Sequence, residues 1–378
     1  MGKVYSLKDL AVYFLKLGAL GFGGPVALVG YMHRDLVEAR KWFNEEEYRE
    51  GLALSQLAPG PLAAQLAIYL GFVHYGVTGA TIVGIAFVIP SFIMVLATGW
   101  AYVEYGGLPW MQAVFYGVGA AVIGIIAMSS YKLTSKSVNK DWLLWIIFFT
   151  LAITTFVFEE EILWLILLGE IAVWVQRTPP SWLKLSGNIF VPLLLQAPAI
   201  SSSSKLIDIA WFFTKAGAFV FGSGLAIVPF LYGGVVKEYA WLNEQEFVDA
   251  VAVAMITPGP VVITVGFIGY LVAGFPGAIV AASATFLPCY LFTILPAPYF
   301  KKWGKHPGIK AFVDGVTVAA IGAIAGAVVV LANRTLNDLP TILIASSTAA
   351  ILWRFKKLQE PYIIAAAAFL GIILKSIL

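Results

Sequence analysis

The sequence predicts an all-α polytopic membrane protein, built from two homologous repeats of inverted topology with broken or re-entrant helices. Three observations carry this prediction. The composition is 60% hydrophobic and only 12% charged, with a mean hydropathy of +0.87, whereas soluble domains carry roughly 25% charged residues. Residues 14–71 recur at residues 213–270. Each copy also carries glycine and proline clusters that interrupt helices.

The composition also narrows the class of protein. The formal net charge of +3 is small and gives no reason to expect a nucleic-acid partner. A single cysteine, Cys289, excludes an internal disulfide, and three histidines without a Cys/His cluster argue against a metal site. No phosphate-binding loop is present. We therefore expect no enzyme activity and no cofactor, and we expect the lipid bilayer as a partner.

The repeat divides the chain into two halves. We expect an N-terminal repeat over residues 1–184, a linker over residues 185–204 with a further crossing, and an inverted C-terminal repeat over residues 205–378. Identities between the copies include Lys16 and Lys215, Trp42 and Trp241, Asn44 and Asn243, and the Pro-Gly-Pro triplets at 59–61 and 258–260.

Apolar runs predict four membrane spans in each half. About 20 apolar residues are needed to cross the hydrocarbon, and the last two runs of the first half are near the minimum. The runs cover residues 77–103, 110–131, 142–158 and 162–175, then 275–300, 311–333, 339–353 and 361–374.

Two helical segments precede these spans and are broken. In the first half, residues 7–21 and 25–41 are joined at a Gly-Gly-Pro sequence, and residues 45–57 and 62–75 at Pro-Gly-Pro. Broken backbone at membrane depth survives only where protein or a wet cavity satisfies it. Each piece either crosses the membrane or folds back as a re-entrant hairpin. The positions of Lys and Arg favour hairpins, and they place the two halves in opposite orientations.

The breaks are candidate anion sites, because a helix N-terminus offers free N–H groups and about half a positive charge. Prolines after the glycines stand where a new helix begins. The alternative is simple kinking for helix packing. The candidate residues are Gly23, Gly24, Gly60 and Pro61 in the first half and Gly222, Ser223, Gly224, Thr257, Gly259 and Pro260 in the second.

Two lysines interrupt apolar runs at the same repeat position, Lys16 and Lys215. A charge at the bilayer centre costs at least about 2.5–3.5 kcal/mol, so a symmetric pair of lysines suits a divalent oxyanion. In the alternative, each side chain extends to the interface. Nearby amide and hydroxyl groups are candidate hydrogen-bond donors to the oxyanion, with helix packing as the alternative: Gln56, Gln65, Thr257 and Thr264.

Carboxylates within apolar spans are candidate proton carriers. Asp314 lies early in a span of the second half, and Glu170 lies in the middle of a short span of the first half. The alternative for each is burial in an ion pair or a place near the interface.

The broken segments resemble the chromate ion transporter family. The resemblance rests on Phe-Gly-Gly-Pro at 22–25, His33 and Arg34 with Trp42, Gln-Leu-Ala-Pro-Gly-Pro at 56–61, and their counterparts at 221–224 and 257–260. It covers residues 14–130 and 213–330, and the full length fits the two-domain members. The second copy departs from the first: Ser223 and Gly224 replace Gly24 and Pro25, and Gly233 and Met255 replace Arg34 and Gln56.

The resemblance implies a multi-pass inner-membrane secondary transporter that exports chromate, with sulfate as a structural analogue and proton-motive energy as the driving force. Three alternatives stay open: an anion channel, a sulfate-type oxyanion transporter of the same fold, and a structural or partner-binding membrane protein. A proton as coupling ion and a homodimer are further expectations.

Overall fold

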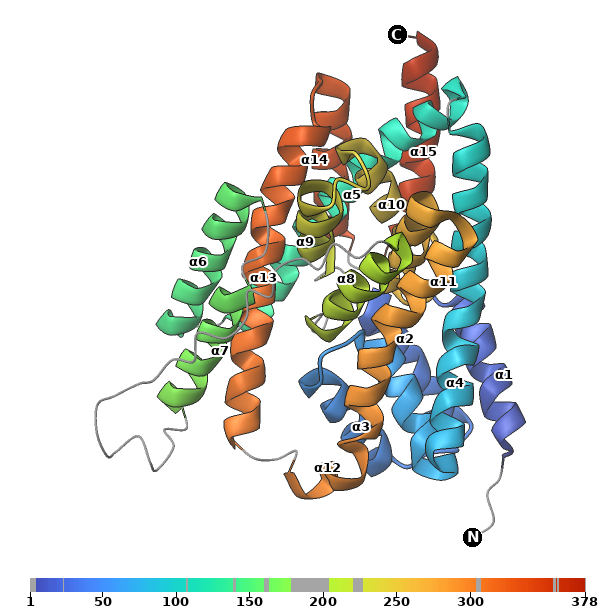
Figure 1. Cartoon of the computed structure of the whole chain (residues 1–378), viewed down its shortest axis with the longest axis vertical. Coiled ribbons are helices and arrows are strands. Elements are labelled where there is room, and N and C mark those ends of the chain that lie inside the picture. The colour runs from blue at the N-terminus through green and yellow to red at the C-terminus, as the bar shows by residue number, and fades with distance from the viewer. Residues whose placement is uncertain are drawn as a thin grey trace.

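The computed structural model describes residues 5–22, 24–106, 108–138, 141–159, 163–177, 204–219, 227–303, 307–355, 358 and 360–377. Within these ranges the regular structure is helical (Figure 1). The helices of the first half are α1 (Leu7–Leu20), α2 (Gly24–Met32), the π-helix η1 (His33–Ala39), α3 (Glu45–Leu57), α4 (Leu62–Tyr105), α5 (Pro109–Ser137), α6 (Trp142–Phe158) and α7 (Leu163–Arg177).

The second half repeats this order. Its helices are α8 (Lys205–Phe219), α9 (Ile227–Leu231), the π-helix η4 (Tyr232–Glu238), α10 (Glu244–Ile256), the 3₁₀ turn η5 (Val261–Ile263), α11 (Thr264–Ile294), α12 (Ala297–Trp303), α13 (Pro307–Thr335), α14 (Leu339–Arg354) and α15 (Glu360–Ile377).

Helices α3 and α10 begin with the same capping arrangement. Asn44 accepts a hydrogen bond from the Glu47 amide at 2.8 Å, and Asn243 accepts one from the Glu246 amide at 2.9 Å. Each glutamate accepts a bond from the amide of its asparagine in return. These are capping boxes, which satisfy amides that the first turn of a helix leaves free. The expected helical segment over residues 45–57 is therefore confirmed, and α10 repeats its start.

The two longest helices are kinked at the same repeat position. In α4 the kink is at Gly76 (φ 60°, ψ −153°), and in α11 it is at Gly274 (φ 62°, ψ −153°). The segment before each kink belongs to the broken region, and the segment after it is the first predicted span. The expected boundary between the piece over residues 62–75 and the span from residue 77 is thus confirmed, although the two stay joined as one bent helix.

Helices α4 and α11 pack against each other in antiparallel directions. Near one end of the contact, Thr81 and Tyr290 share a hydrogen bond of 2.6 Å between hydroxyls. Near the other end, Gly99 lies against the Tyr270 ring. As residue numbers rise in α4 they fall in α11, and Figure 1 shows α11 leading downward to α12.

The later helices exchange partners between the halves. Helix α5 packs against α14 and α15 of the second half, and α13 packs against α6 and α7 of the first. Matching glycines allow close approach: a Cβ at Gly124 would lie 2.4 Å from the Ala345 carbonyl oxygen, and one at Gly322 would lie 2.5 Å from that of Phe148. The halves therefore interlock through equivalent contacts.

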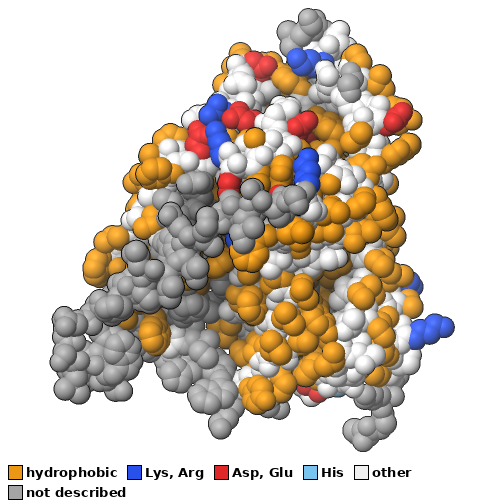
Figure 2. All heavy atoms as spheres, viewed as in Figure 1, with side chains coloured by type: hydrophobic (Ala, Val, Ile, Leu, Met, Phe, Trp, Pro, Cys, Tyr) orange, Lys and Arg blue, Asp and Glu red, His pale blue; other side chains and the backbone are white. Residues whose placement is uncertain are grey.

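The outer surface is apolar, as a bilayer requires. Four helical stretches are long and apolar enough to cross a membrane: 62–105, 109–135, 261–300 and 314–335. Helices α6 and α14 are shorter and also apolar. Figure 2 shows hydrophobic side chains over much of the face in view, with most of the visible charged ones toward the top. The protein is a multi-pass, all-α membrane protein. The predicted further crossing over residues 188–200 lies outside the described residues.

Candidate functional site at the helix breaks

The first Pro-Gly-Pro turn joins α3 to α4 and is held from inside. Gly60 has φ 141°, a value that L side chains rarely adopt. Gln65 is fully buried, and its Nε2 donates a 2.6 Å hydrogen bond to the Pro59 carbonyl. Its Oε1 has no hydrogen-bond partner among the described residues. Pro61 precedes α4 without a side-chain cap, so no cap occupies the first amides of this helix.

The second Pro-Gly-Pro turn contacts a break of the first half. Gly259, with φ 94°, donates its amide to the Gly21 carbonyl at 2.9 Å. Beside it, Ser91 Oγ donates to the Gly18 carbonyl at 3.3 Å. Pro260 precedes η5, again without a side-chain cap. The structure therefore brings the first break of one half together with the second break of the other.

Each turn also packs against the long helix of the opposite half. A Cβ on Gly60 would lie 3.1 Å from Cys289 Cβ in α11, and one on Gly259 would lie 2.1 Å from Ser91 Oγ in α4. Ser91 and Cys289 occupy the same repeat position. The two contacts are thus equivalent, and glycine leaves the space that both require.

The threonines predicted at the second turn donate to backbone. Thr257 Oγ1 donates to the Val253 carbonyl at 2.7 Å, and Thr264 Oγ1 to the Ala250 carbonyl at 2.8 Å. Both hydroxyls therefore use their proton in helix packing and present acceptor lone pairs to anything else. Gln56 is exposed. Their role toward a substrate stays a prediction.

Both lysines lie away from the helix contact that their neighbours make. Gly18 packs against the Phe87 carbonyl of α4, and two residues correspond to roughly 200° around an α-helix. Lys16 is accordingly exposed on the outer side of α1. Lys215 is half-buried on α8, with its Nζ 5.7 Å from the centre of the Trp211 ring. These positions fit extension toward an interface, and a substrate role stays a prediction.

The remaining glycine and serine candidates lie at the first break of each half. Gly24 begins α2 with φ 71°. The candidates that lie outside the described residues are Gly23, Gly222, Ser223 and Gly224, together with the side chain of Glu170.

Asp314 lies in an ion pair. Arg177 of α7 donates to Asp314 Oδ2 at 2.6 Å and to Asp141 Oδ2 at 2.8 Å. At the equivalent junction in the other half, Tyr116 donates to Asp338 at 2.6 Å, and Lys375 Nζ lies 4.7 Å from the centre of the Tyr116 ring. Both clusters tie a long helix to its partners. A coupling role for Asp314 stays a prediction.

Sequence reasoning missed one buried acid, Asp249 in α10. Its side chain is 3% exposed. Tyr102 Oη donates to Oδ2 at 2.7 Å, and Gln245 Nε2 donates to Oδ1 at 2.8 Å. Burial disfavours the ionised form of Asp249, whereas both hydrogen bonds favour it. The available signal was a lone acid in the otherwise apolar run from Phe247 to Ile256.

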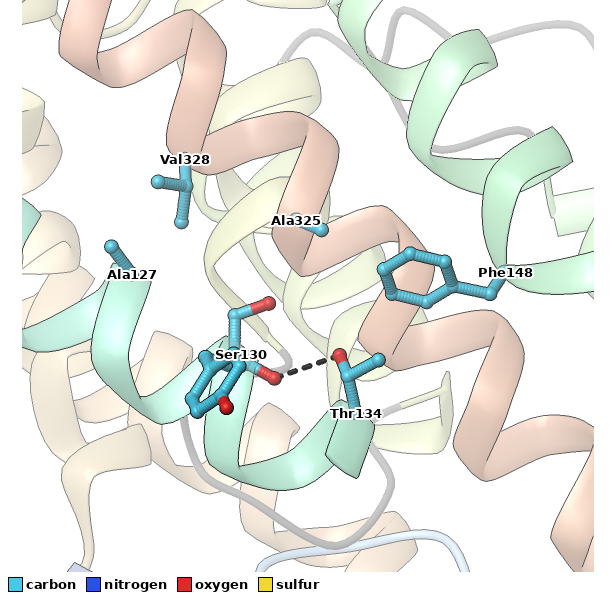
Figure 3. A pocket seen from close by; sticks show the side chains of 7 residues that line it. Ala127, Ser130, Thr134, Phe148, Ala325 and Val328 are labelled. Carbon is cyan, nitrogen blue, oxygen red and sulfur yellow. Dashed lines mark hydrogen bonds between the residues drawn. The ribbon is translucent and has the colours of Figure 1, made fainter. Parts of the chain in front are cut away.

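Two open pockets lie on the described part of the protein, and one of them adjoins the first turn. One of about 280 Å³ is formed by α5, α6 and α13 (Figure 3), where Thr134 donates to the Ser130 carbonyl at 2.8 Å. Another of about 680 Å³ is lined largely by apolar side chains of α3, α11 and α12, and by Ala58 and Pro59 of the first turn. Neither is lined by a charged residue. The described residues hold no group of three or more metal-ligating side chains.

The duplicated breaks match a known family. A sequence model of the chromate transporter family matches residues 8–174 and again 207–372. The chain belongs to the chromate transporter family. It is 67% identical to a chromate transport protein of Cupriavidus metallidurans over 98% of this chain and 93% of the relative. It is 65% identical to a probable chromate transport protein of Synechococcus elongatus, over 98% and 96%.

A more distant relative also matches nearly the whole chain. A chromate transport protein of Pseudomonas aeruginosa is 27% identical over 97% of this chain and 92% of its own length. No solved structure is significantly similar to this chain. The family confirms the resemblance seen in the sequence and places the chain among transporters rather than enzymes.

Proposed function

We propose that this protein is a secondary active transporter. It exports chromate, or a related tetrahedral divalent oxyanion, across the inner membrane and is driven by the proton-motive force. Of two relatives that match nearly the whole chain, one is named a chromate transport protein and the other a probable chromate transport protein. The observation that carries the proposal is the pair of Pro-Gly-Pro turns, each buried against the long helix of the other half.

The turns suit an oxyanion because each leads into an uncapped helical segment. The segments that begin after Pro61 and Pro260 have no side-chain cap, whereas α1, α3 and α10 have capping boxes. An uncapped start leaves amides for a ligand and carries about half a positive charge. Two such starts would balance part of a divalent charge. Gly60 and Gly259 provide the positive-φ backbone that these turns require.

We further propose that the two halves are inverted repeats that rock against each other. The antiparallel contact of α4 with α11 and the exchanged helix pairs support this arrangement. Transporters built from inverted repeats bind substrate between the repeats, where broken helices meet. The units are residues 1–184 and 205–378, joined by a linker. A substrate-binding role of Lys16 and Lys215 stays a prediction. A homodimer also stays a prediction.

A panel of oxyanions in proteoliposomes tests the proposal. We expect labelled chromate to accumulate above its equilibrium level when a pH gradient is imposed, and sulfate and molybdate to compete according to their fit. A channel would bring chromate only to equilibrium. A structural or partner-binding protein would move no anion and would gain no thermal stability from chromate. Empty liposomes and liposomes without a gradient are the controls.

A further inference from the structure

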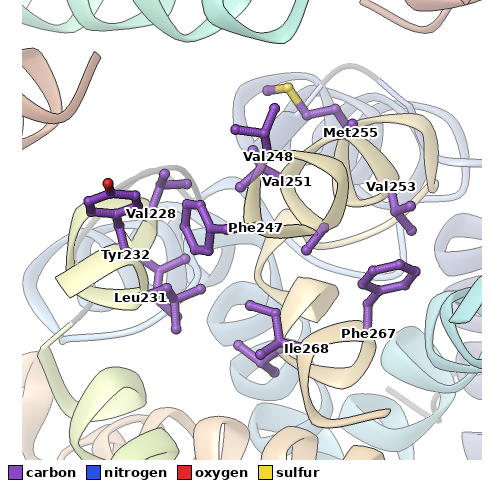
Figure 4. Packing of buried hydrophobic residues seen from close by; sticks show 14 of the residues in the cluster. Val228, Leu231, Tyr232, Phe247, Val248, Val251, Val253, Met255, Phe267 and Ile268 are labelled. Carbon is purple, nitrogen blue, oxygen red and sulfur yellow. The ribbon is translucent and has the colours of Figure 1, made fainter. Parts of the chain in front are cut away.

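Asp249 lies in α10, the largely buried helix that precedes the second Pro-Gly-Pro turn. Each residue of α10 from Phe247 to Met255 is buried, and Figure 4 shows its apolar side chains packed against those of α9, η4 and α11. An ionised carboxylate in such surroundings is costly unless it is paired. Asp249 therefore requires an explanation that packing does not supply.

The partners of Asp249 are neutral. Tyr102 comes from α4 of the first half, and Gln245 comes from one turn earlier in α10. The other titratable group acting on Asp249 is Glu246, whose negative charge opposes ionisation. No basic residue among the described parts of α4, α5, α11, α13 and α15 acts on it. Its two donors favour the ionised form, whereas burial and Glu246 favour the protonated form.

The basic residues near the start of α10 are engaged elsewhere. Arg334 of α13 lies 3.1 Å from Glu159 and 3.5 Å from Glu244, and Lys237 of η4 pairs with the same two glutamates. This four-residue network neutralises itself. Among the described residues Asp249 therefore has no cationic partner, and protonation is the way to remove its charge.

Asp249 also lies where α10 contacts the long helices of both halves, α4 and α11. Its phenol partner is on α4, and the carbonyl of the next residue, Ala250, accepts the hydroxyl of Thr264 at the start of α11. Both long helices are thus tied to α10 at this point. Loss of the charge favours the dry packing seen here, and gain of the charge favours a conformation in which water reaches the carboxylate.

We propose that Asp249 binds and releases the proton that drives anion transport. The carboxylate takes up one proton from the side where protons are abundant, crosses the dry state as the neutral acid, and releases the same proton on the other side. No other bond forms or breaks. This inference rests on the proposed function, because it requires that transport be coupled to protons.

The test separates proton-driven transport from anion exchange in proteoliposomes. Asp249→Asn keeps the size and the hydrogen-bond acceptor but cannot ionise. We expect it to lose pH-gradient-driven chromate accumulation and to keep exchange of labelled for unlabelled chromate, which needs no net proton movement. Glu50→Gln is the matched control, since Glu50 occupies the same repeat position and is half-buried, and it should keep both activities.

The outcomes distinguish the two proposals. If the wild type shows no effect of the gradient, proton coupling itself fails. If the wild type responds and Asp249→Asn responds equally, only the role of Asp249 is overturned. Loss of exchange in a variant that unfolds at the wild-type temperature also overturns it. If Asp249→Asn does not fold, Asp249→Glu decides: the inference requires gradient-driven transport with a shifted pH midpoint, and an unchanged midpoint refutes it.

Infrared difference spectra distinguish protonation of Asp249 from a purely structural role, because only protonation gives a pH-dependent carboxylic acid band. We expect the wild type to show a carbonyl stretch of a protonated carboxylic acid that disappears on raising the pH. Asp249→Asn should lack this band, and Glu50→Gln should retain it. A band of equal size in all three proteins would refute the assignment.

Discussion

Helices α3 and α10 are copies of one another, yet they occupy different environments. In α10 each residue from Phe247 to Met255 is buried. The buried residues of α3 are Tyr48, Gly51, Leu54 and Ser55. The cause is tertiary, because α10 packs against α4, α5, α11, α13 and α15, whereas α3 packs mainly against α4 of its own half.

The difference changes what an aligned acid can do. Glu50 is half-buried, follows Arg49 in sequence and bonds to Tyr69 of its own half. Asp249 is closed off from water and bonds to Tyr102 of the other half. An acid near water can stay ionised, whereas burial without a cationic partner favours the protonated form of an acid. The duplication therefore placed an acidic residue at the same position in both halves. Their different burial gives the two acids different preferences for the protonated form.

The largest expected effect comes from adding a methyl group at the turns. In Gly259→Ala the Cβ would meet Ser91 Oγ at 2.1 Å and the Gly18 carbonyl oxygen at 3.2 Å, in a left-handed backbone. Overpacking and left-handed strain together cost about 2–5 kcal/mol. We expect a large fall in the unfolding temperature of the purified protein and loss of chromate transport.

Gly60→Ala tests the other copy. Its Cβ would meet the end of the Gln65 side chain at 2.6 Å, a longer contact than the 2.1 Å to Ser91 Oγ at Gly259, and the longer glutamine side chain can shift further. We therefore expect a smaller fall. Gly30→Ala is the control, because Gly30 is exposed and its Cβ would meet nothing within 4 Å. Equal behaviour of all three variants would show that the turns do not require glycine.

Local sequence was sufficient to predict the helices but not their burial. The bounds of α3 and α6 follow from Asn44 and Asp141 as N-caps and from the residues that end the apolar runs. The pairing of α5 with α14 and α15 involves residues more than 200 positions apart, which no local pattern encodes. For the same reason the sequence did not reveal Asp249: α3 and α10 have similar patterns, and only the cross-half packing buries one of them.

Other features depend on direction around a helix. The sequence placed Lys16 in an apolar run, but only the contact of Gly18 with α4 shows which side of α1 that lysine occupies. Likewise, Asp314 read as a lone acid in a span, and its partner Arg177 lies at the far end of another helix in the other half. Helical periodicity predicts which residues share one face of a helix, but only tertiary contacts show what that face packs against.

A smaller effect is expected from the tyrosines that bond to the two acids. Tyr102→Phe leaves Asp249 Oδ2 without its donor in a buried site, which costs about 1.5–3 kcal/mol for the ionised form. Because that bond favours the ionised form of Asp249, its loss favours the protonated form, and the pH midpoint of gradient-driven transport moves upward. Tyr69→Phe should leave the midpoint unchanged, since water can reach Glu50. A downward shift in Tyr102→Phe, or equal shifts in both variants, would contradict the comparison.

The smallest effect should be the same in both copies. Asn44 and Asn243 are exposed N-caps with nearly equal hydrogen bonds of 2.8 and 2.9 Å. Replacing either with alanine removes one cap, which costs about 1 kcal/mol, and we expect similar small decreases in unfolding temperature and little change in transport. Ser6→Ala, which removes the equivalent cap of α1, is a matched reference. A much larger loss for Asn243→Ala would mean that the two helices already differ at their starts. Equal losses would confine the difference between the copies to the buried part of α10, where Asp249 lies.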